Sequence, residues 1–343
     1  MSAVRCTLEP TPPPAFASLL ESVTFGTSGL RYRRLHAAAQ LARLHDPVFV
    51  AAREGGTFVG GYALDRRALR VGDRATRGVY RGALAVAADA QGRGVGRALA
   101  ARGREWIDAL ARATGEPVLS WGCIDADNHR SLEVLRGAGA DAVGGLTMLM
   151  LYRQRPRERL ALEALAPGRD SREAAVLART ERDCAARDLT SSASPGLALV
   201  DGDGVRVGAR VAPSVYRIET MGRALDALVR VTVTPFAPAR RRFDPTAFRY
   251  LRFSDVALRE GAERDWPAFV SSALARHEAH FGLLFLDPRG RLHGRLRRVG
   301  AFGRLVHGTS ASLRVMARWS PPATNAELPP LPKGPLALPP VDG

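Results

Sequence analysis

The stretch Leu84-Ala-Val-Ala-Ala-Asp-Ala-Gln-Gly-Arg-Gly-Val-Gly-Arg97 decides the fold of this chain. Apolar residues close a predicted strand at 78–86, and a helical pattern begins after the glycines at positions 92, 94 and 96. Glycine allows a tight turn and a close approach of the backbone to a ligand. The first turn of a helix offers free N–H groups and the positive end of its dipole. The stretch therefore predicts a strand-to-helix turn that can hold phosphate groups.

The elements on either side extend this unit. Residues 48–52 and 58–64 are predicted to form a hairpin, because two glycines lie between two apolar runs. Residues 118–124 form a further apolar strand. The last two strands of the unit are expected at 140–143 and 146–152.

The second half of the chain repeats this order of elements. A hairpin is predicted at 197–200 and 205–211, followed by a strand at 248–256, a helix at 266–280 and a strand at 282–287. The repeat of helix, hairpin, strand, helix and strand indicates two related units.

The glycine stretch resembles the signature of the GNAT acyltransferases, in which Gln/Arg-x-x-Gly-x-Gly/Ala follows a strand. Gln91-Gly-Arg-Gly-Val-Gly96 fits that pattern, and Asn128-His-Arg-Ser131 looks like the family's Asn-x-x-Ser/Ala element. The resemblance covers residues 30–152. It implies an α+β fold with a GNAT-like mixed central sheet flanked by helices, here as two tandem domains. In the second domain Glu260-Gly-Ala-Glu-Arg264 stands at the place of the glycine loop, so that domain is expected to be degenerate.

The resemblance implies that the sheet parts between the strands at 78–86 and 118–124 and that acetyl-coenzyme A, as co-substrate, lies in the gap. A backbone N–H at Leu84 would polarise the thioester carbonyl as an oxyanion donor. No metal is implied. The residues that the resemblance assigns to coenzyme binding are Leu84, Val86, Gln91, Gly92, Arg93, Gly94, Val95, Gly96, Arg97, Asn128 and Ser131.

The chain departs from the family pattern at the catalytic positions. Leu135 stands where many members have a Tyr that protonates the departing thiolate, and the strand at 78–86 carries no Glu base. Tyr80, which strand alternation places on the same face as Leu84, and Asp125, just beyond the second strand, are the candidate catalytic groups. Asp127 is a further candidate. Simple packing of Tyr80 and helix capping by Asp127 are the alternatives.

These elements predict five segments. We expect a flexible lead-in at 1–25, a GNAT acyl-coenzyme A-binding domain at 26–155 and a linker at 156–169. A degenerate GNAT-like domain follows at 170–319. The proline-rich tail at 320–343 is expected to be disordered or extended.

Composition narrows the class of protein. No segment of the 343 residues approaches the ~20 apolar residues that cross a bilayer, and the N-terminus lacks a signal-peptide pattern, so a cytoplasmic protein is expected. The three cysteines are far apart, which disfavours a disulfide framework or a cysteine metal site. The net charge of +16 is spread evenly, and Lys333 is the single lysine among 50 basic residues. We therefore do not expect a nucleic-acid partner.

The expected function is acyl-coenzyme A-dependent N-acyltransfer, with an acetyl group passing directly to a primary amine in a ternary complex. The alternative is a non-catalytic acyl-coenzyme A-binding sensor or regulator. The sequence does not identify the acceptor amine. The second domain could support the fold, shape the acceptor site or form a homodimer contact.

Overall fold

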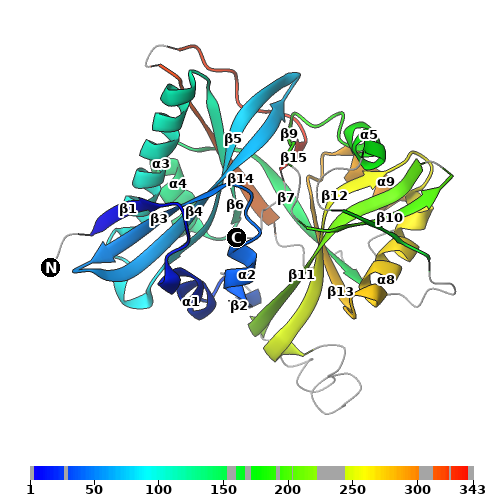
Figure 1. The fold of residues 1–343 in the computed structure, drawn as a ribbon, viewed down its shortest axis with the longest axis horizontal. Helices are drawn as coiled ribbons and strands as arrows, with labels where there is room; N and C mark the ends of the chain where they lie inside the picture. The colour runs from blue at the N-terminus through cyan, green and yellow to red at the C-terminus, as the bar shows by residue number, and fades with distance from the viewer. Residues whose placement is uncertain are drawn as a thin grey trace.

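The computed structural model describes residues 4–26, 30–152, 160–166, 171–190, 194–202, 204–221, 244–300, 312–323 and 326–338. Within these residues one twisted sheet runs through the molecule, and helices cover it in separate groups (Figure 1). This large mixed sheet flanked by helices is the architecture expected from the sequence.

The first half of the chain supplies one end of the sheet. Its elements are β1 (Arg5–Glu9), α1 (Pro14–Ser22), β2 (Leu30–Leu35), α2 (Ala37–Leu41), β3 (Pro47–Glu54), β4 (Thr57–Val71), β5 (Arg74–Val86), η1 (Ala88–Ala90), α3 (Val95–Thr114), β6 (Val118–Asp125), α4 (His129–Gly137) and β7 (Asp141–Tyr152).

The second half supplies the other end. Its elements are β8 (Glu163–Leu165), α5 (Ser171–Thr180), β9 (Ala186–Asp188), β10 (Gly196–Asp201), β11 (Gly204–Met221), η2 (Pro245–Ala247), β12 (Phe248–Leu258), η3 (Glu263–Asp265), α8 (Trp266–Arg276), β13 (Phe281–Leu286), α9 (Arg291–Arg298), β14 (Ser312–Ser320) and β15 (Leu336–Ala337).

The strand order is symmetric about the centre of the sheet. It runs β1-β3-β4-β5-β6-β14-β7-β13-β12-β11-β10-β8. The pairs β5/β6 and β12/β13 are parallel, and the other neighbours along this path are antiparallel. Each half therefore gives its last strand to the other, because β14 lies between β6 and β7 while β7 pairs with β13 (Figure 1).

Glycines set the turn of the first hairpin. Gly55 and Gly56 have φ of +56° and +87°, and Glu54 pairs with Thr57 across them. A two-residue loop with positive φ at both positions matches the twist of the flanking strands. The hairpin predicted at 48–52 and 58–64 is thus formed by β3 and β4.

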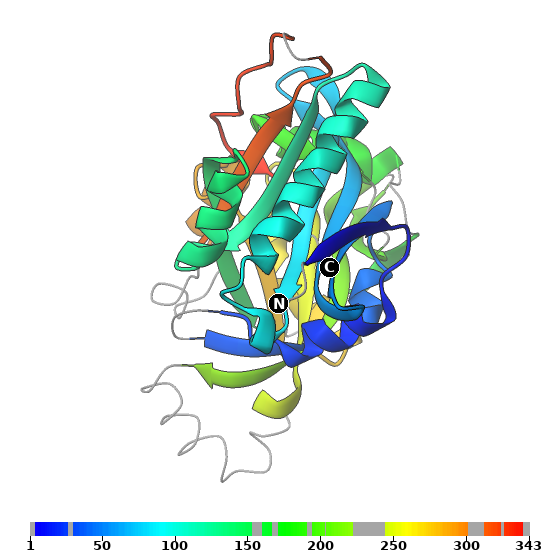
Figure 2. The ribbon, with the colours of Figure 1, turned by 90° about the vertical axis from the view of Figure 1, so that its left-hand side faces the viewer.

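Helix α3 packs on the sheet through a stripe of residues spaced by four. Val95, Leu99, Gly103, Ile107 and Ala111 are buried, as an amphipathic helix requires. A Cβ at Gly103 would lie 2.8 Å from the ring of Tyr62, so glycine lets the helix approach β4 closely. Figure 2 shows α3 and α4 on the same face of the first half of the sheet.

The segment 1–25, expected to be a flexible lead-in, is instead ordered from residue 4. β1 pairs with β3, and α1 buries Phe16 and Leu20 completely. A Cβ at Gly61 would lie 2.5 Å from the ring of Phe16, which shows how tightly α1 sits on the sheet. The prediction missed this because three prolines precede the helix and hide its short apolar pattern.

Three further expectations differ from the structure. The strands expected at 140–143 and 146–152 are one strand, β7. Gly144 lies within β7 and makes no turn. Glycine is needed there for close packing, since a Cβ would lie 2.8 Å from Leu336. The predicted linker at 156–169 contains β8, although residues 156–159 and 167–169 lie outside the described part of the chain. The predicted tail contains β15, which pairs with β9.

Candidate functional site

The strands β5 and β6 part at the middle of the first half of the sheet. Their parallel pairing covers four residue pairs, from Arg77↔Val118 to Tyr80↔Trp121. Beyond Tyr80, β5 continues to Val86 and β6 continues to Asp125, without pairing to each other. The sheet therefore opens as a V whose closed end lies at Tyr80 and Trp121, as expected for the coenzyme gap.

A β-bulge lies in the open part of β5. Ala83 has φ of +53°, and the pairing with β4 shifts so that Gly82 faces Ala63 while Ala85 faces Gly61. A positive φ is uncommon for a residue with a side chain and marks a constrained backbone. The bulge re-aims the N–H groups of the strand beside the open V.

The bulge changes which side chains share a face. Tyr80 and Gly82 lie on one face, since a Cβ at Gly82 would be 2.5 Å from the Tyr80 ring. Leu84 packs with the cluster under α3, on the opposite face, while Ala83 and Ala85 pack with the cluster of α1 and α2. The expectation that Tyr80 and Leu84 share a face is therefore wrong, because the extra residue of the bulge reverses the alternation.

The glycine stretch forms the expected loop before α3. Gly92 and Gly94 have φ of +77° and +84°, and Gly94 is the N-cap residue of the helix. The first helical hydrogen bond is donated by Ala98 N–H to Gly94 O at 3.0 Å. The N–H groups that precede it have no helical acceptor, and the loop from Gln91 to Gly94 is exposed. These are the requirements of an anion cradle.

Side chains of the loop have separate tasks. Gln91 Nε2 donates to Val86 O at 3.1 Å and so ties the loop to the end of β5. Arg93 forms an ion pair with Glu54 of β3, which holds the loop at the β3–β4 hairpin. Val95 is buried in the core and can offer only its backbone, whereas Arg97 is exposed. Of the two predicted arginine contacts to phosphate, Arg93 already has a carboxylate partner.

The residues predicted downstream lie at the start of α4, beside the open end of β6. Asn128 is the N-cap of α4, and its Oδ1 accepts a hydrogen bond from Ser131 N–H at 3.1 Å. Asp125 Oδ1 accepts from Asp127 N–H at 3.0 Å in the preceding turn. Asn128 and Asp125 therefore shape the turn between β6 and α4.

Tyr80 lies at the closed end of the V. It is 5% exposed and meets Trp121 edge to face, with ring centroids 5.7 Å apart. Leu135, at the position of the family's Tyr, is also 5% exposed and packs in the core under α4. A proton donor is thus missing at that place, whereas Tyr80 lies in the last residue pair before the strands part.

Sequence reasoning missed two polar side chains on the α3 face of the V. Arg81 is 7% exposed and Tyr62 is 2% exposed. Among the described residues, no partner bonds to Nε or Nη2 of Arg81 or to Oη of Tyr62. Strand alternation could have identified Arg81, because it follows Val79 onto an otherwise apolar face.

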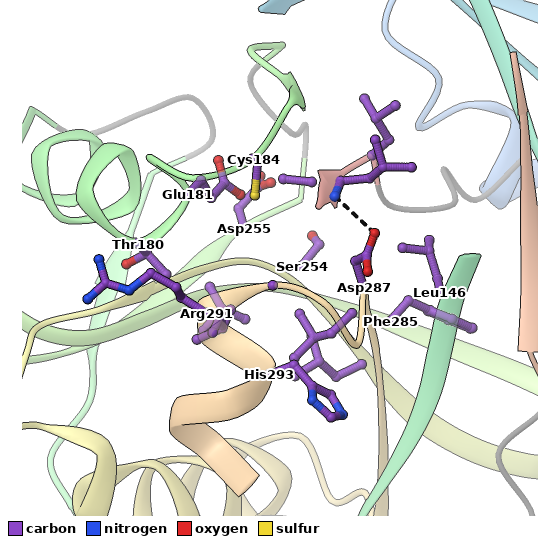
Figure 3. Close-up of a pocket in the computed structure, with 18 of the residues that line it drawn as sticks. Leu146, Thr180, Glu181, Cys184, Ser254, Asp255, Phe285, Asp287, Arg291 and His293 are labelled. Atoms are coloured by element: carbon purple, nitrogen blue, oxygen red, sulfur yellow. Dashed lines mark hydrogen bonds between the residues drawn. The ribbon is translucent and has the colours of Figure 1, made fainter. Parts of the chain in front are cut away.

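The second half of the sheet has a similar fork. The pairing of β12 with β13 ends at Phe253↔Leu284, and Asp255 beyond it has φ of +48°. A cavity of about 60 Å³ occupies the gap, far below the 300–1,000 Å³ of ordinary ligand pockets. On one side of this cavity Leu336 of β15 donates its N–H to Asp287 Oδ2 at 3.1 Å (Figure 3).

An arginine of α9 fills the loop before α8. Arg295 pairs with Glu263 at 2.7 Å and also donates to Leu258 O and Arg259 O. Burial opposes ionisation of Glu263, but hydrogen bonds from backbone amides and from Arg295 outweigh it and lower its pKa. The loop before α8 thus presents a carboxylate in its charged form, whereas the loop before α3 presents glycine amides.

The described residues form neither a metal-ligand cluster nor a membrane-spanning helix. No group of three or more His, Cys, Asp or Glu side chains there is arranged to hold a metal ion. None of the helices in the same residues combines the length and the apolar content that a bilayer crossing requires.

The comparisons agree with this geometry. Residues 15–140 match the family model described as Acetyltransferase (GNAT) family, and the domain formed by these residues belongs to that family. The match begins before residue 26, where the domain was expected to start, and so includes α1. No curated protein matches the chain.

Solved structures resemble nearly the whole chain at low identity. N-myristoyltransferase from Saccharomyces cerevisiae with bound myristoyl-CoA has a TM-score of 0.58 at 7% identity, over 98% of this chain and 89% of that one. A GCN5-related N-acetyltransferase from Anabaena variabilis has a TM-score of 0.53 at 13% identity, over 92% and 72%. At these identities the likeness shows the fold.

Proposed function

We propose that the first unit binds an acyl-coenzyme A in the V between β5 and β6 and transfers the acyl group to a primary amine. The observation that carries this proposal is the fork itself, where strand pairing stops at Tyr80↔Trp121 and a bulge follows at Ala83. The glycine loop at the open end supplies the anion cradle. Membership of the domain in the GNAT family supports the same assignment.

The coenzyme would lie with its pyrophosphate at the amides between Gln91 and Arg97. Its pantetheine arm would follow the open edge of β5 past Val86 and Leu84, with Asn128 and Ser131 on the other side of the gap. The thioester carbonyl would then meet the backbone N–H groups at the bulge, and Leu84 N–H would stabilise the developing oxyanion.

Transfer would be direct. The neutral amine attacks the thioester carbon, the N–C bond forms, and the C–S bond breaks as the tetrahedral intermediate collapses. The amine must lose a proton and the thiolate must gain one. Asp125 and Tyr80 are the proposed groups for these two transfers, and acetyl is the proposed acyl group.

We propose that the second unit is a degenerate GNAT-like unit. The symmetric strand order and the fork at Asp255 support a common origin of the two units. The ion pair of Glu263 with Arg295 fills the place of the coenzyme cradle. This unit would complete the sheet and border the acceptor site.

A calorimetric titration of acetyl-coenzyme A, followed by measurement of free thiol released with a panel of amines, tests the enzyme. We expect binding of one equivalent and thiol release that falls by about 10²–10⁴-fold in Tyr80→Phe or Asp125→Asn, whichever residue transfers protons. Binding of no acyl-coenzyme A would refute the proposal.

The second candidate is an acyl-coenzyme A sensor without turnover. It is favoured by Leu135, which is buried and cannot protonate a thiolate. Tight binding without thiol release from any amine, and equal behaviour of wild type and Tyr80→Phe, would support this candidate.

A further inference from the structure

The polar groups of Arg81 and Tyr62 that have no partner lie together at the fork, on the α3 face of the sheet. Val79 packs in the cluster under α3 and Tyr80 packs on the other face, so alternation directs Arg81 to the α3 side. Tyr62 packs in that same cluster and faces the bulge, because its neighbours Gly61 and Ala63 pair with Ala85 and Gly82.

The two groups also interact electrostatically. Burial raises the pKa of Tyr62 to about 12, and the positive charge of Arg81 opposes this rise. Burial lowers the pKa of Arg81, Tyr62 opposes the change and the positive charge of Arg318 adds to it. The guanidinium is therefore held in the core close to the bulge, in the region between α3 and β14.

Among the described residues, no carboxylate bonds to Nε or Nη2 of Arg81. Asp108 of α3 is engaged by Arg318, which contacts its Oδ1 at 2.8 Å and its Oδ2 at 3.3 Å and also bonds to Ser320. The charge of Asp108 is thus already engaged by Arg318, whose own positive charge acts against Arg81. A buried unpaired charge is costly and is normally paired, so the arrangement favours an anion as the missing partner.

The direction in which the proposed coenzyme runs through the gap indicates which group carries the anion that pairs with Arg81. Its pantetheine would run from the glycine loop along β5 toward the bulge, so the acyl group would continue toward the closed end of the V. Arg81 stands three residues before Leu84, which would be about 10 Å in a regular strand and is less here because the bulge lies between them. An arginine side chain and a short acyl chain together bridge such a distance.

We infer that this enzyme uses a short acyl-coenzyme A whose acyl group ends in a carboxylate, which Arg81 binds with Tyr62 beside it. Arg81 is then the residue that determines acyl specificity. The carboxylate stays intact while the carbonyl at the other end of the chain is transferred to the amine. The inference rests on the proposed function and replaces acetyl with a dicarboxylic acyl group such as succinyl.

Calorimetric titration of the full chain with acetyl-, butyryl- and succinyl-coenzyme A tests the inference. A charge-assisted hydrogen bond predicts that succinyl-coenzyme A binds about 10–100-fold more tightly than butyryl-coenzyme A, which has the same number of acyl carbons. Arg81→Met should abolish this ratio, whereas Arg112→Met, on the exposed side of α3, should keep it. Arg81→Lys retains the charge and serves if the Met variant does not fold. The Lys variant should reduce the ratio, because it loses the planar fork of donors.

The outcomes distinguish failure of the proposed function from failure of the inference about Arg81. Binding of no coenzyme ester by wild type refutes the proposed function. Binding of acetyl-coenzyme A without preference for succinyl over butyryl overturns only the inference about Arg81, as does a preference that survives in Arg81→Met. Free succinate added with coenzyme A distinguishes a site for any small carboxylate. If that mixture reproduces the gain, the carboxylate need not belong to the acyl group, and the inference also fails.

Discussion

Substitutions at Gly94 test the anion cradle directly, because comparing Gly94→Ala with Gly94→Asp separates the effect of backbone strain from the effect of charge. A Cβ at Gly94 meets nothing within 4 Å, although φ is +84°. Gly94→Ala therefore introduces backbone strain of roughly 1–2 kcal/mol in folding stability without a clash. Gly94→Asp adds no more strain, because Asp tolerates positive φ better than Ala, and it places one negative charge at the start of α3.

The charge acts against the pyrophosphate of the coenzyme. Two unit charges about 6 Å apart in water repel by about 0.7 kcal/mol, so two phosphate charges give about 1.4 kcal/mol. This is a tenfold rise in Kd, and a lower effective dielectric would enlarge it. We expect Gly94→Asp to bind an acyl-coenzyme A at least tenfold more weakly than Gly94→Ala.

Gly115 provides the matched control at the other end of the same helix. It also has positive φ, +68°, and open space at the Cβ position. The 20 residues of α3 separate the two sites by about 30 Å, well beyond the Debye length of about 8–10 Å in ordinary buffer. Gly115→Asp should bind like wild type in calorimetry. Equal affinities for Gly94→Asp and Gly94→Ala would mean that phosphate does not lie at this loop.

Three other predictions concern stability and reactivity. Burial raises the pKa of Asp188 to about 6 despite the opposing charge of Arg67. The folded protein therefore holds a proton on Asp188 more tightly than the unfolded chain does. The stability gained from this proton is greatest below the unfolded pKa and is lost as pH rises through 6. In urea unfolding, wild type should lose about 2.4 kcal/mol more than Asp188→Asn between pH 4 and pH 7, and parallel curves would contradict this. Burial also raises the pKa of Cys123 and Cys184 to about 12. A colorimetric thiol reagent at pH 8 should therefore label both cysteines fully only after unfolding. Rapid labelling of both in the native protein would contradict this prediction. Met316 of β14 is fully buried under α4. Met316→Ala should cost about 2–5 kcal/mol in the same urea assay, and a loss below 1 kcal/mol would show that β14 is not packed there.

Local sequence signals predicted the local structure well. The glycines at 92 and 94 identified the loop before α3, and the pair Gly55-Gly56 identified the first hairpin, because each requires a backbone conformation that glycine adopts easily. The order of strands and helices in both halves followed from apolar periodicity.

The features that depend on distant contacts escaped prediction. Nothing in the sequence of β14 specifies β6 and β7 as its neighbours, because any antiparallel apolar strand offers the same hydrogen bonds. The bulge at Ala83 has no signal, since alanine rarely adopts positive φ. Leu336 and Leu338 are buried within a proline-rich tail whose composition suggested disorder.

The strand exchange at the centre of the sheet has a consequence for synthesis. β7 ends at Tyr152 and β14 begins at Ser312, 160 residues later (312 − 152). At 5–20 residues per second a ribosome needs about 8–32 s to make that interval. Throughout it the first unit has β6 and β7 without the strand that belongs between them. The nascent chain must therefore keep two apolar strand edges from pairing with each other or with a neighbouring chain, and the first unit can complete its sheet only after Ser320, the last residue of β14, has emerged.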